Sequence, residues 1–473
     1  MISWKFILFS IYQVIVILTI IHVIMDNRQP AKTMAWALVI WFVPVAGIVF
    51  YLFFGMNTRK EKFISQRSLD QLTKRSMLEF VEQKDLYLPE EYKPIIDLFV
   101  NENYALPFKN THYETYTDGY AFFPALLSAI AGAKEHIHVD MYIFADDPLG
   151  MLISDALIDK AREGVEVKVI YDDVGCWNVK HRFFERMRDE GIEVVPFLPV
   201  RFPSFTSKVN YRNHRKLIVI DGRIGFVGGM NIALRYVKGR GTGPWRDTMV
   251  QVSGSGVYGL QRAFLIDWYF CDRTMISNRK YYPPIPDVTG ESIVQTVTSG
   301  PVAPYPEIMQ GYVRMILSAK KYVYIETPYF LPTEPVLFAL KTAAVAGVDV
   351  RILVPYRSDG KIVEWAGRSY LREVAEAGCK VSFYTNGFLH SKLLVSDDAI
   401  CTCGSTNFDF RSFENNFESN VFFYGSEMAC HLRDVFLADE AQAVLFEEVP
   451  QRLNPHFMKR LWESLMRLLS PLM

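Results

Sequence analysis

Two short stretches of the chain each place a histidine and a lysine two residues apart and then close on an aspartate. In chain order these residues are His214, Lys216 and Asp221, then His390, Lys392 and Asp397. Side chains two positions apart share one face of a strand, so each histidine is expected to point the same way as its lysine. Burying both groups is costly unless an anion meets them. Two histidines and two lysines offer a nucleophile, an acid and positive charge, which phosphodiester exchange requires.

The chain around these stretches is built twice, from about residue 112 onward. The repeated segments are residues 133–144 and 319–330, 164–171 and 347–354, and 191–195 and 378–382. Each set predicts alternating helices and strands, with helical patterns of about ten to fifteen residues between the β-rich runs. This alternation predicts an α/β fold with mixed, mainly parallel sheets.

The duplicated motifs also carry a family resemblance. Each is followed by a Gly-Gly or Gly-Ser turn and then by an asparagine, Asn231 or Asn407. In these features the chain resembles the phospholipase D superfamily. The segment Asn-Phe-Asp-Phe-Arg-Ser at residues 407–412, together with two apolar segments near the N-terminus, makes it similar to the bacterial cardiolipin synthases of that superfamily. The resemblance implies two pseudo-symmetric α/β/α halves whose motifs meet at one active site.

The resemblance further implies a role for each residue of the motifs. It makes His214 the nucleophile that forms a phosphohistidine, and His390 the acid that protonates the departing alcohol and then acts as a base. The groups that would hold the non-bridging phosphate oxygens are Lys216, Lys392, Asn231 and Asn407. Asp247 and Glu418 match carboxylates that orient the histidine of the opposite half. No metal or cofactor is expected, because these cations and amides supply the charge that a metal otherwise supplies.

The aspartates in and after the motifs allow more than one interpretation. Asp221 and Asp397 each stand at the start of a predicted turn between two strands. An aspartate in such a turn accepts main-chain N–H bonds, which is a structural role. Direct participation in catalysis is the alternative for both residues, and the spacing favours neither. A solvated position at the surface is the alternative for Asp247.

The first copy carries an insertion before its motif, at about residues 199–212. Its basic residues, which are interleaved with aromatic residues, are Arg201, Lys208 and Arg212. That composition suits an anionic lipid headgroup at a membrane surface. It suits single-stranded nucleic acid nearly as well. An ordinary surface loop is the third interpretation.

Two apolar segments precede the duplicated region. Residues 6–25 carry no formal charge over about the length that spans a bilayer, and residues 34–54 form a second such run. The short connection between them predicts a transmembrane hairpin within residues 1–55, with two buried helices of a soluble core as the alternative. The basic residues that follow are Arg59, Lys60 and Lys62. They favour a cytoplasmic location for the rest of the chain.

The remaining boundaries follow from composition and from the repeat. Residues 56–110 are predicted to form a linker, residues 111–289 the first half and residues 290–473 the second half. Apolar residues recur at helical spacing from Phe457 to Leu472, which predicts an amphipathic helix on the membrane or against the second half. With 51 basic and 52 acidic residues the chain is nearly neutral, so an anionic partner must be met by local basic patches. No pair of its six cysteines has the spacing of a zinc site.

The resemblance and the apolar segments together predict a multi-pass enzyme of the cell membrane with a cytoplasmic body. Its expected reaction joins two phosphatidylglycerol molecules into cardiolipin and releases glycerol. Water as the acceptor would instead make it a membrane-bound phospholipase D. A membrane-tethered phosphodiesterase or nuclease and an inactive scaffold are further alternatives. The expected partners are phosphatidylglycerol, other anionic phospholipids and the bilayer, without nucleic acid, and a homo-oligomer is compatible with the sequence.

Overall fold

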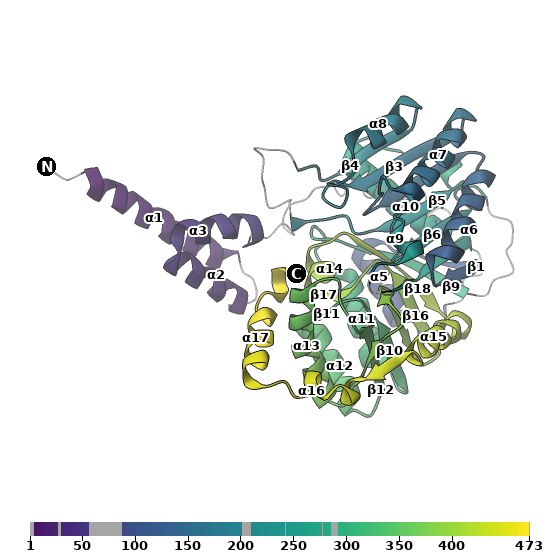
Figure 1. The fold of residues 1–473 in the computed structure, drawn as a ribbon. Helices are drawn as coiled ribbons and strands as arrows, with labels where there is room; N and C mark the ends of the chain where they lie inside the picture. The colour runs from purple at the N-terminus through teal and green to yellow at the C-terminus, as the bar shows by residue number, and fades with distance from the viewer. Residues whose placement is uncertain are drawn as a thin grey trace. The chain divides into compact units, whose positions relative to one another are not determined.

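The computed structural model describes residues 4–26, 30–55, 88–200, 210–241, 243–276, 278–284 and 292–472. Among these, residues 88–199 and 212–472 belong to one compact body, and the N-terminal helices belong to a separate unit. The body carries both histidine motifs, so its fold is the one that positions the candidate site (Figure 1).

The N-terminal unit contains three helices and a closing π-helical turn. They are α1 (Trp4–Met25), α2 (Pro30–Phe42), α3 (Pro44–Phe50) and η1 (Tyr51–Gly55). Among the described helices α1 alone, with 22 residues, is long and apolar enough to cross a bilayer. The second predicted segment is interrupted at Val43, because Pro44 lacks the N–H that would continue α2.

A mixed sheet of 15 strands runs through the body. Its strands, in order across the sheet, are β19 (Ala443–Leu445), β13 (Lys380–Tyr384), β12 (Asp349–Pro355), β10 (Tyr322–Glu326), β15 (Leu393–Ser396), β16 (Ile400–Gly404), β18 (Glu418–Tyr424), β9 (Ser292–Ser299), β1 (Pro107–Tyr116), β8 (Met249–Gly254), β6 (Ile224–Gly228), β5 (Lys216–Ile220), β2 (His136–Met141), β3 (Glu166–Asp172) and β4 (Glu193–Phe197). Outward from the central neighbours β1 and β9, the order β1-β8-β6-β5-β2-β3-β4 repeats as β9-β18-β16-β15-β10-β12-β13. The two pseudo-symmetric halves predicted from the internal repeat are confirmed.

Each half combines parallel and antiparallel pairing. The strands β2-β3-β4 and β10-β12-β13 are parallel, and the other neighbouring pairs of the large sheet are antiparallel. The crossover helices are α7 (Pro148–Arg162), α8 (His181–Asp189), α12 (Glu334–Val345) and α13 (Lys361–Glu376). The sheet is therefore mixed, as predicted, but mainly antiparallel. Parallel neighbours need a crossover of about a dozen residues or more. The turn at residues 221–223 between β5 and β6 is much shorter, so these two strands must be antiparallel.

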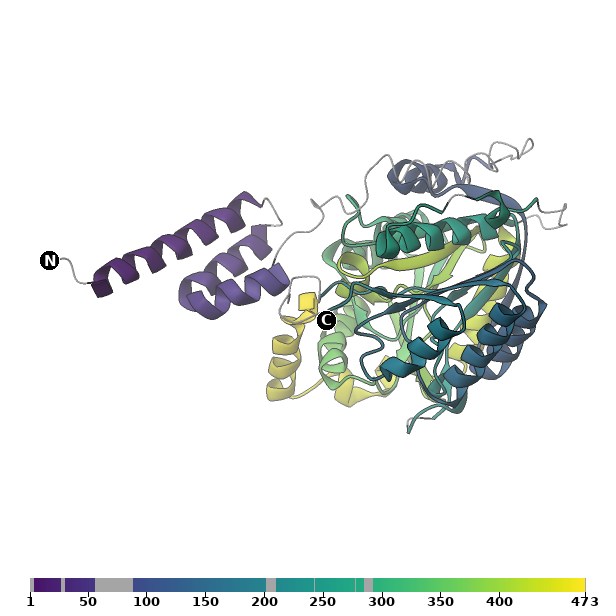
Figure 2. The same cartoon turned by 90° about the horizontal axis from the view of Figure 1, so that it is seen from above.

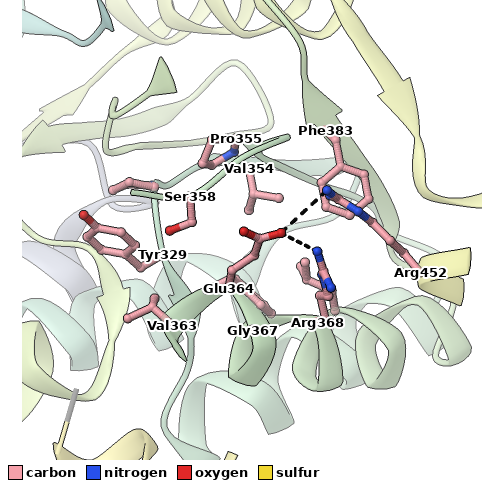
Figure 3. Close-up of a pocket in the computed structure, with 13 residues that line it drawn as sticks. Tyr329, Val354, Pro355, Ser358, Val363, Glu364, Gly367, Arg368, Phe383 and Arg452 are labelled. Atoms are coloured by element: carbon pink, nitrogen blue, oxygen red, sulfur yellow. Dashed lines mark hydrogen bonds and ion pairs between the residues drawn. The ribbon is translucent and has the colours of Figure 1, made fainter. Parts of the chain in front are cut away.

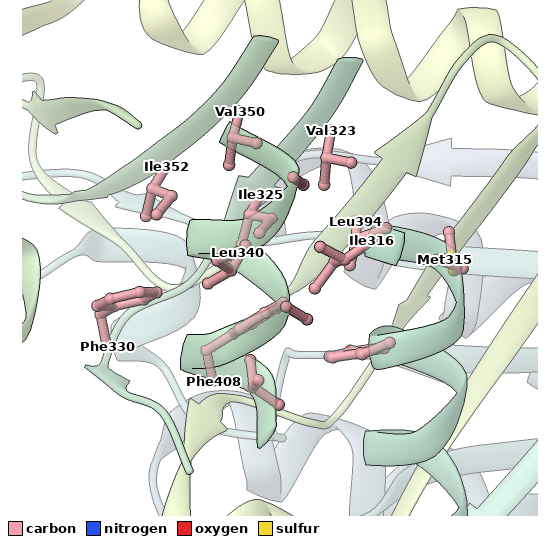
Figure 4. Close-up of a cluster of buried hydrophobic side chains, with 14 of the residues drawn as sticks. Met315, Ile316, Val323, Ile325, Phe330, Leu340, Val350, Ile352, Leu394 and Phe408 are labelled. Atoms are coloured by element: carbon pink, nitrogen blue, oxygen red, sulfur yellow. The ribbon is translucent and has the colours of Figure 1, made fainter. Parts of the chain in front are cut away.

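Alternate residues of the strands pack against helices on opposite faces of the sheet. In the second half, Val323 and Ile325 of β10 point into an apolar cluster with side chains of α11 (Glu307–Ser318) and α12 (Figure 4). Tyr324, between them, stacks on Phe436 of α15 (Ser426–Glu440) on the other face. In the first half, α6 (Gly119–Gly132), α7 and α8 take the place of α11, α12 and α13, and α10 (Val257–Asp272) takes that of α15.

The segment before the first half is more structured than a linker. Residues 56–87 lie outside the described residues, but α5 (Lys93–Asn103) follows them and β1 already begins at Pro107. The buried residues of α5 are Ile95, Ile96 and Phe99, and they pack in the apolar cluster of the second half. Their spacing puts them on one helical face. Residues 93–110, expected in the connector, are thus part of the body.

Candidate active site

The two histidine motifs meet where the halves join. Residues of β14 (Phe388–Leu389) pair in parallel with β7 (Trp245–Arg246) of the first half. The main-chain N–H of His390 continues this pairing and donates to Arg246 O at 2.7 Å. The matching contact on the other side is His214 N–H to Phe417 O at 2.9 Å. Main-chain bonds thus fix each histidine to the half that does not carry its motif.

The imidazole of His214 is held by a carboxylate of the second half. His214 Nδ1 lies 3.0 Å from Glu418 Oε1 and 3.1 Å from Oε2. Glu418 is fully buried, and the Ser405 hydroxyl and the Asn416 amide donate to its oxygens. Because Nδ1 is engaged by the carboxylate, Nε2 is the ring nitrogen that is available for chemistry.

The imidazole of His390 is held in the same way by the first half. Its Nδ1 lies 2.6 Å from Asp247 Oδ2, and the main-chain N–H of Thr248 donates to Asp247 Oδ1 at 2.8 Å. The hydroxyls of Thr248 and Ser391 lie 2.8 Å apart, which adds a further bond between the halves. Asp247 is fully buried. The solvated position considered for this residue is therefore wrong.

Burial governs the ionisation of these four groups. Desolvation lowers the pKa of His214 to about 4 and that of His390 to about 3. Burial alone would raise the pKa values of Glu418 and Asp247, but the neighbouring lysines and imidazoles outweigh it and hold both below their usual range. The site therefore favours neutral imidazoles against ionised carboxylates, and the carboxylate beside each Nδ1 favours the tautomer with its proton on that nitrogen.

Two lysines without solvent exposure complete the centre of the site. Lys216 is 0% exposed and Lys392 is 1% exposed, and each ammonium donates to the main-chain carbonyl of the histidine two residues before it. Desolvation, with repulsion from Lys392, lowers the pKa of Lys216 to about 7 even though Glu418 opposes the shift. The pKa of Lys392 is also lowered by burial. An anion that entered the site would relieve both desolvation costs.

Aromatic rings lie beside the histidines, and the asparagines that follow the motifs bond to neighbouring groups of the protein. The Tyr142 ring lies 4.9 Å from that of His214, and the Tyr329 ring lies 6.5 Å from that of His390. Asn231 Nδ2 donates to the Tyr236 hydroxyl at 2.5 Å, while its Oδ1 accepts from the main-chain N–H of Ile143. Asn407 Nδ2 donates to Asp409 Oδ2 at 3.1 Å. Both asparagine side chains are thus oriented by bonds within the protein.

The aspartates that close the motifs do not reach the site. Asp221 follows the end of β5, the strand that begins beside His214, so about five residues of extended chain separate the two. Its carboxylate accepts the main-chain N–H groups of residues 134–136 at 2.8–2.9 Å. Asp397 accepts those of residues 320–322 at 2.6–2.8 Å. The catalytic alternative for these two residues is therefore corrected to a structural role, because each carboxylate holds a turn to the start of a neighbouring strand.

The insertion that was expected to contact lipid headgroups is only partly described. Arg201 and Lys208 lie outside the described residues. Arg212 is 2% exposed and lies 3.5 Å from the carboxylate of Asp172. Because this guanidinium is buried in an ion pair, the structure does not present it as a surface contact for a headgroup.

Two buried arginines beside the histidines were not predicted from the sequence to belong to the site. Arg246 donates to Asp247 O at 2.8 Å and forms an ion pair with Asp439 at 2.6 Å, while Glu326 lies 3.9 Å away. Both carboxylates belong to the second half. Burial and the proximity of Asp439 raise the pKa of Glu326 to about 8. Arg246 therefore binds the two halves together behind His390.

Arg215 has the matching position behind His214. Its Nε donates to Glu418 O at 3.0 Å, and its guanidinium pairs with Asp267. Asp140, near Asp267, has a pKa raised by burial. Asp140 and Glu326 occupy equivalent positions of the repeat, each an acid within a strand. That recurrence was the signal in the sequence that could have revealed both clusters.

A small pocket lies beside the site in the second half (Figure 3). Tyr329 borders it, and α13 supplies Glu364 and Arg368, which pair with each other. Arg452 lies 3.7 Å from Glu364 at the opposite wall. In the described part of the chain, no three His, Cys, Asp or Glu side chains are grouped so that they could hold a metal ion.

Comparisons with known proteins point to one family. A family model described as "Cardiolipin synthase, PLD-like domain" matches residues 126–241 and 312–439, one segment in each half. A model described as "Phospholipase D-nuclease N-terminal" matches residues 14–55. A cardiolipin synthase from Geobacillus sp. (strain WCH70) is 39% identical over 458 residues, which cover 95% of this chain and 90% of the relative. One from Alkalihalophilus pseudofirmus is 40% identical over 464 residues, covering 96% and 91%.

A solved structure shares the fold of the body. The crystal structure of phosphatidylserine synthase from Haemophilus influenzae matches with a TM-score of 0.63 and 15% sequence identity. The match covers 80% of this chain and 100% of that chain. At this level of identity the likeness concerns the fold alone.

Proposed function

Because this chain belongs to the cardiolipin synthase family of phospholipase D-like proteins, we propose that it joins two phosphatidylglycerol molecules into cardiolipin and releases glycerol. Its chemistry is that of a phosphatidyltransferase. The observation that best supports the proposal is the paired setting of His214 and His390, each bonded through Nδ1 to a buried carboxylate of the opposite half. Two imidazoles held in this way provide a nucleophile and an acid in one site.

In the first step, Nε2 of His214 attacks the phosphorus of the first phosphatidylglycerol. A phosphorus–nitrogen bond forms, and the bond from phosphorus to the oxygen of the headgroup glycerol breaks. His390, in its protonated form, gives its Nε2 proton to the departing oxygen, so glycerol leaves neutral. Burial disfavours the protonated form of His390, and the phosphate anion of the substrate offsets that effect.

In the second step, the headgroup hydroxyl of another phosphatidylglycerol gives its proton to His390 and attacks the phosphorus. The phosphorus–nitrogen bond breaks, which frees His214 and yields cardiolipin. His390 is again protonated, so the cycle is balanced in protons. Glu418 and Asp247 keep each ring in the tautomer that presents Nε2.

Lys216 and Lys392 act on the non-bridging phosphate oxygens. Both are buried, so their interaction with an anion is stronger than it would be in water. Asn231 and Asn407, which follow the two motifs in the sequence, are proposed as amide donors to these oxygens. Their side chains now bond to Tyr236 and Asp409, so this role requires an exchange of partners when lipid binds.

The family and the apolar helix α1 indicate association with a membrane. We further propose that the segment up to residue 55 crosses the cell membrane twice and that the body lies on the cytoplasmic side. The basic residues after the second apolar segment support this orientation. Phosphatidylglycerol is then available to the body as substrate in the cytoplasmic leaflet.

The test is incubation of the purified full-length protein with radiolabelled phosphatidylglycerol in mixed micelles. Cardiolipin and free glycerol in equal amounts are the expected products. Phosphatidic acid without cardiolipin would show that water is the acceptor and would overturn the transfer proposal. A double variant of both histidines to alanine, prepared in parallel, controls for contaminating lipid enzymes.

A further inference from the structure

The C-terminal helix α17 (Phe457–Arg467) is held to the body by its polar side. It lies along α13 (Figures 1 and 2). Glu463, which is 0% exposed, forms ion pairs with Arg372 at 2.7 Å and Arg368 at 3.6 Å. One turn further on, Arg467 lies 2.6 Å from Glu373. Two charged side chains of this helix, Glu463 and Arg467, therefore face inward.

Most apolar side chains of α17 and of the residues that follow it face solvent, whereas Met466 packs against the apolar cluster of the second half. Their exposed fractions are 75% for Phe457, 64% for Met458, 43% for Leu461, 47% for Trp462, 44% for Leu465 and 74% for Leu468. This is the reverse of a helix at the surface of a soluble protein, whose apolar stripe faces the core. Rotating α17 to bury these residues would break the ion pairs of Glu463 and leave buried charges without partners. The apolar face must therefore be covered from outside.

The charges around this face fit an anionic lipid surface. Glu463 is the sole carboxylate of α17, and it is turned inward. Arg460 is exposed on α17. The ring of Trp462 lies 5.8 Å from that of Trp365, one turn into α13, where Lys361 is also exposed. Leucines with tryptophan and basic residues form the composition of helices that lie in the interface of a bilayer.

We propose that the outer face of α17, with the first turn of α13, docks on a bilayer that contains anionic phospholipid. The proposal rests on the proposed function, which makes such lipids the substrate, but it concerns a second contact with the membrane besides α1. The face is defined by Phe457, Met458, Leu461, Trp462, Leu465 and Leu468, with Arg460 and Lys361. These residues form the α17 face.

The α17 face is connected to the candidate site through packed elements. The turn η6 (Ser470–Leu472), which follows α17, packs against α14 (Phe410–Glu414). The N-cap of α14 is Asp409, the residue that accepts a bond from Asn407. α13 lies between α17 and the pocket that Tyr329 borders. Docking would thus hold the second half of the site at a fixed position relative to the lipid surface.

The test uses the full-length protein reconstituted in vesicles of phosphatidylglycerol and phosphatidylcholine whose acyl chains carry bromine. Bromine quenches tryptophan fluorescence on contact. The chain has eight tryptophans, so the fluorescence of Trp462 is obtained as the difference between the signal of the unaltered chain and that of Trp462→Phe. We expect quenching of the Trp462 component. In the triple variant Leu461→Ser/Leu465→Ser/Leu468→Ser, the apparent affinity of the α17 face for lipid should fall at least about tenfold. The reason is that the burial of each leucine in the interface would be lost.

A matched control removes three exposed apolar residues from other helices, in Leu152→Ser/Leu317→Ser/Val345→Ser. Their exposed fractions, 50%, 48% and 78%, are similar to those on α17, and this variant should keep the quenching. A second variant, Arg460→Glu, leaves the packing against α13 intact. It should weaken quenching in vesicles with phosphatidylglycerol and leave it unchanged in pure phosphatidylcholine.

Absence of Trp462 quenching in the unaltered chain would overturn the proposal. So would a crosslink from the α17 face to the same face of a second copy, because a protein would then cover it. Cardiolipin production in mixed micelles is measured on the same preparations. Production without quenching would refute the docking and leave the proposed function standing, whereas quenching without any lipid turnover would refute the function alone.

Discussion

The main-chain N–H of His390 donates to the carbonyl oxygen of Arg246 at 2.7 Å, although the two residues belong to different halves of the body. The guanidinium of Arg246 continues this connection, because it pairs with Asp439 of the second half at 2.6 Å and donates to Asp247 O. One residue thus links the position of a proposed catalytic histidine to that of its carboxylate. The seam between the halves and the site are stabilised by the same bonds.

Replacing this arginine should destabilise the body. Arg246→Met would leave the buried carboxyl groups Glu326 and Asp439 without their cation, which costs about 3–5 kcal/mol for a buried ion pair broken on one side. Urea unfolding of the purified protein, followed by near-UV circular dichroism, measures the loss. The triple variant Arg246→Met/Glu326→Gln/Asp439→Asn should recover most of it. A loss below about 1 kcal/mol in the single variant would contradict the role of the cluster.

The two histidines should behave differently when replaced. His214→Ala is expected to abolish both cardiolipin formation and the covalent phospho-enzyme. His390→Ala should slow turnover by about 10²–10⁴-fold, the usual contribution of a general acid, while the covalent intermediate still forms slowly. Acid-quenched reactions with labelled phosphatidylglycerol detect the intermediate directly. A labelled intermediate that survives in His214→Ala would reverse the two roles.

The carboxylates behind the histidines should affect rate more than lipid binding. Glu418→Gln and Asp247→Asn keep the shape of each side chain but change which tautomer of the imidazole is favoured. We expect kcat to fall by about a hundredfold or more in either variant, with a much smaller change in KM. Steady-state kinetics in mixed micelles separates the two constants. A change confined to KM would mean that these residues position lipid instead of imidazole.

The aspartates that close the motifs should affect stability and leave the chemistry intact. Asp221→Ala removes three bonds from main-chain N–H groups and is expected to cost about 2–3 kcal/mol. The fraction that remains folded should keep the kcat of the unaltered enzyme. Active-site titration by phospho-enzyme burst, combined with thermal unfolding, distinguishes the two effects. A hundredfold loss of kcat in fully folded Asp221→Ala would restore a catalytic role.

The raised pKa of Glu326 predicts a pH dependence of stability. Burial, together with Asp439, raises its pKa from 4.5 to about 8 in the folded protein. Between pH 4.5 and 8 the folded state therefore holds a proton that the unfolded state has released, so this contribution to stability is lost as pH rises through that window. Glu326→Gln stays neutral throughout, so its stability relative to the unaltered chain should rise as the pH increases from 4.5 to 8. Urea unfolding at each pH measures the difference, and a gain toward acid pH instead would contradict the assignment.

Much of the site could be predicted from the sequence because its chemistry depends on residue types at short spacing. His214 and Lys216 must share a strand face whatever surrounds them, and the second copy at His390 and Lys392 makes chance an unsatisfactory explanation. The duplication likewise predicts two halves, since each repeat alternates helices with strands. The family resemblance added Asp247 and Glu418, which no local spacing would have identified.

Other features were decided by tertiary structure alone. Spacing fixes the direction in which a side chain points along a strand, but it does not fix what lies opposite. Asp221 is part of the same motif as His214 and yet stands at the far end of β5, and Arg212, expected at the surface, is buried against Asp172. Arg246 gains its role only when Asp439, nearly two hundred residues later, folds against it.

The C-terminal helix shows most clearly the difference between what the sequence pattern determines and what tertiary packing determines. Its periodicity predicted an amphipathic helix, and the structure contains one. Periodicity cannot determine which face of the helix packs against the body. The hydrophobic effect favours covering the apolar face, but it does not specify whether the body or another surface covers it. The ion pairs of Glu463 with Arg368 and Arg372 of α13 determine it here, and they turn the leucines outward. The sequence by itself determined the chemistry and the repeat, and packing between distant segments decided which residues meet.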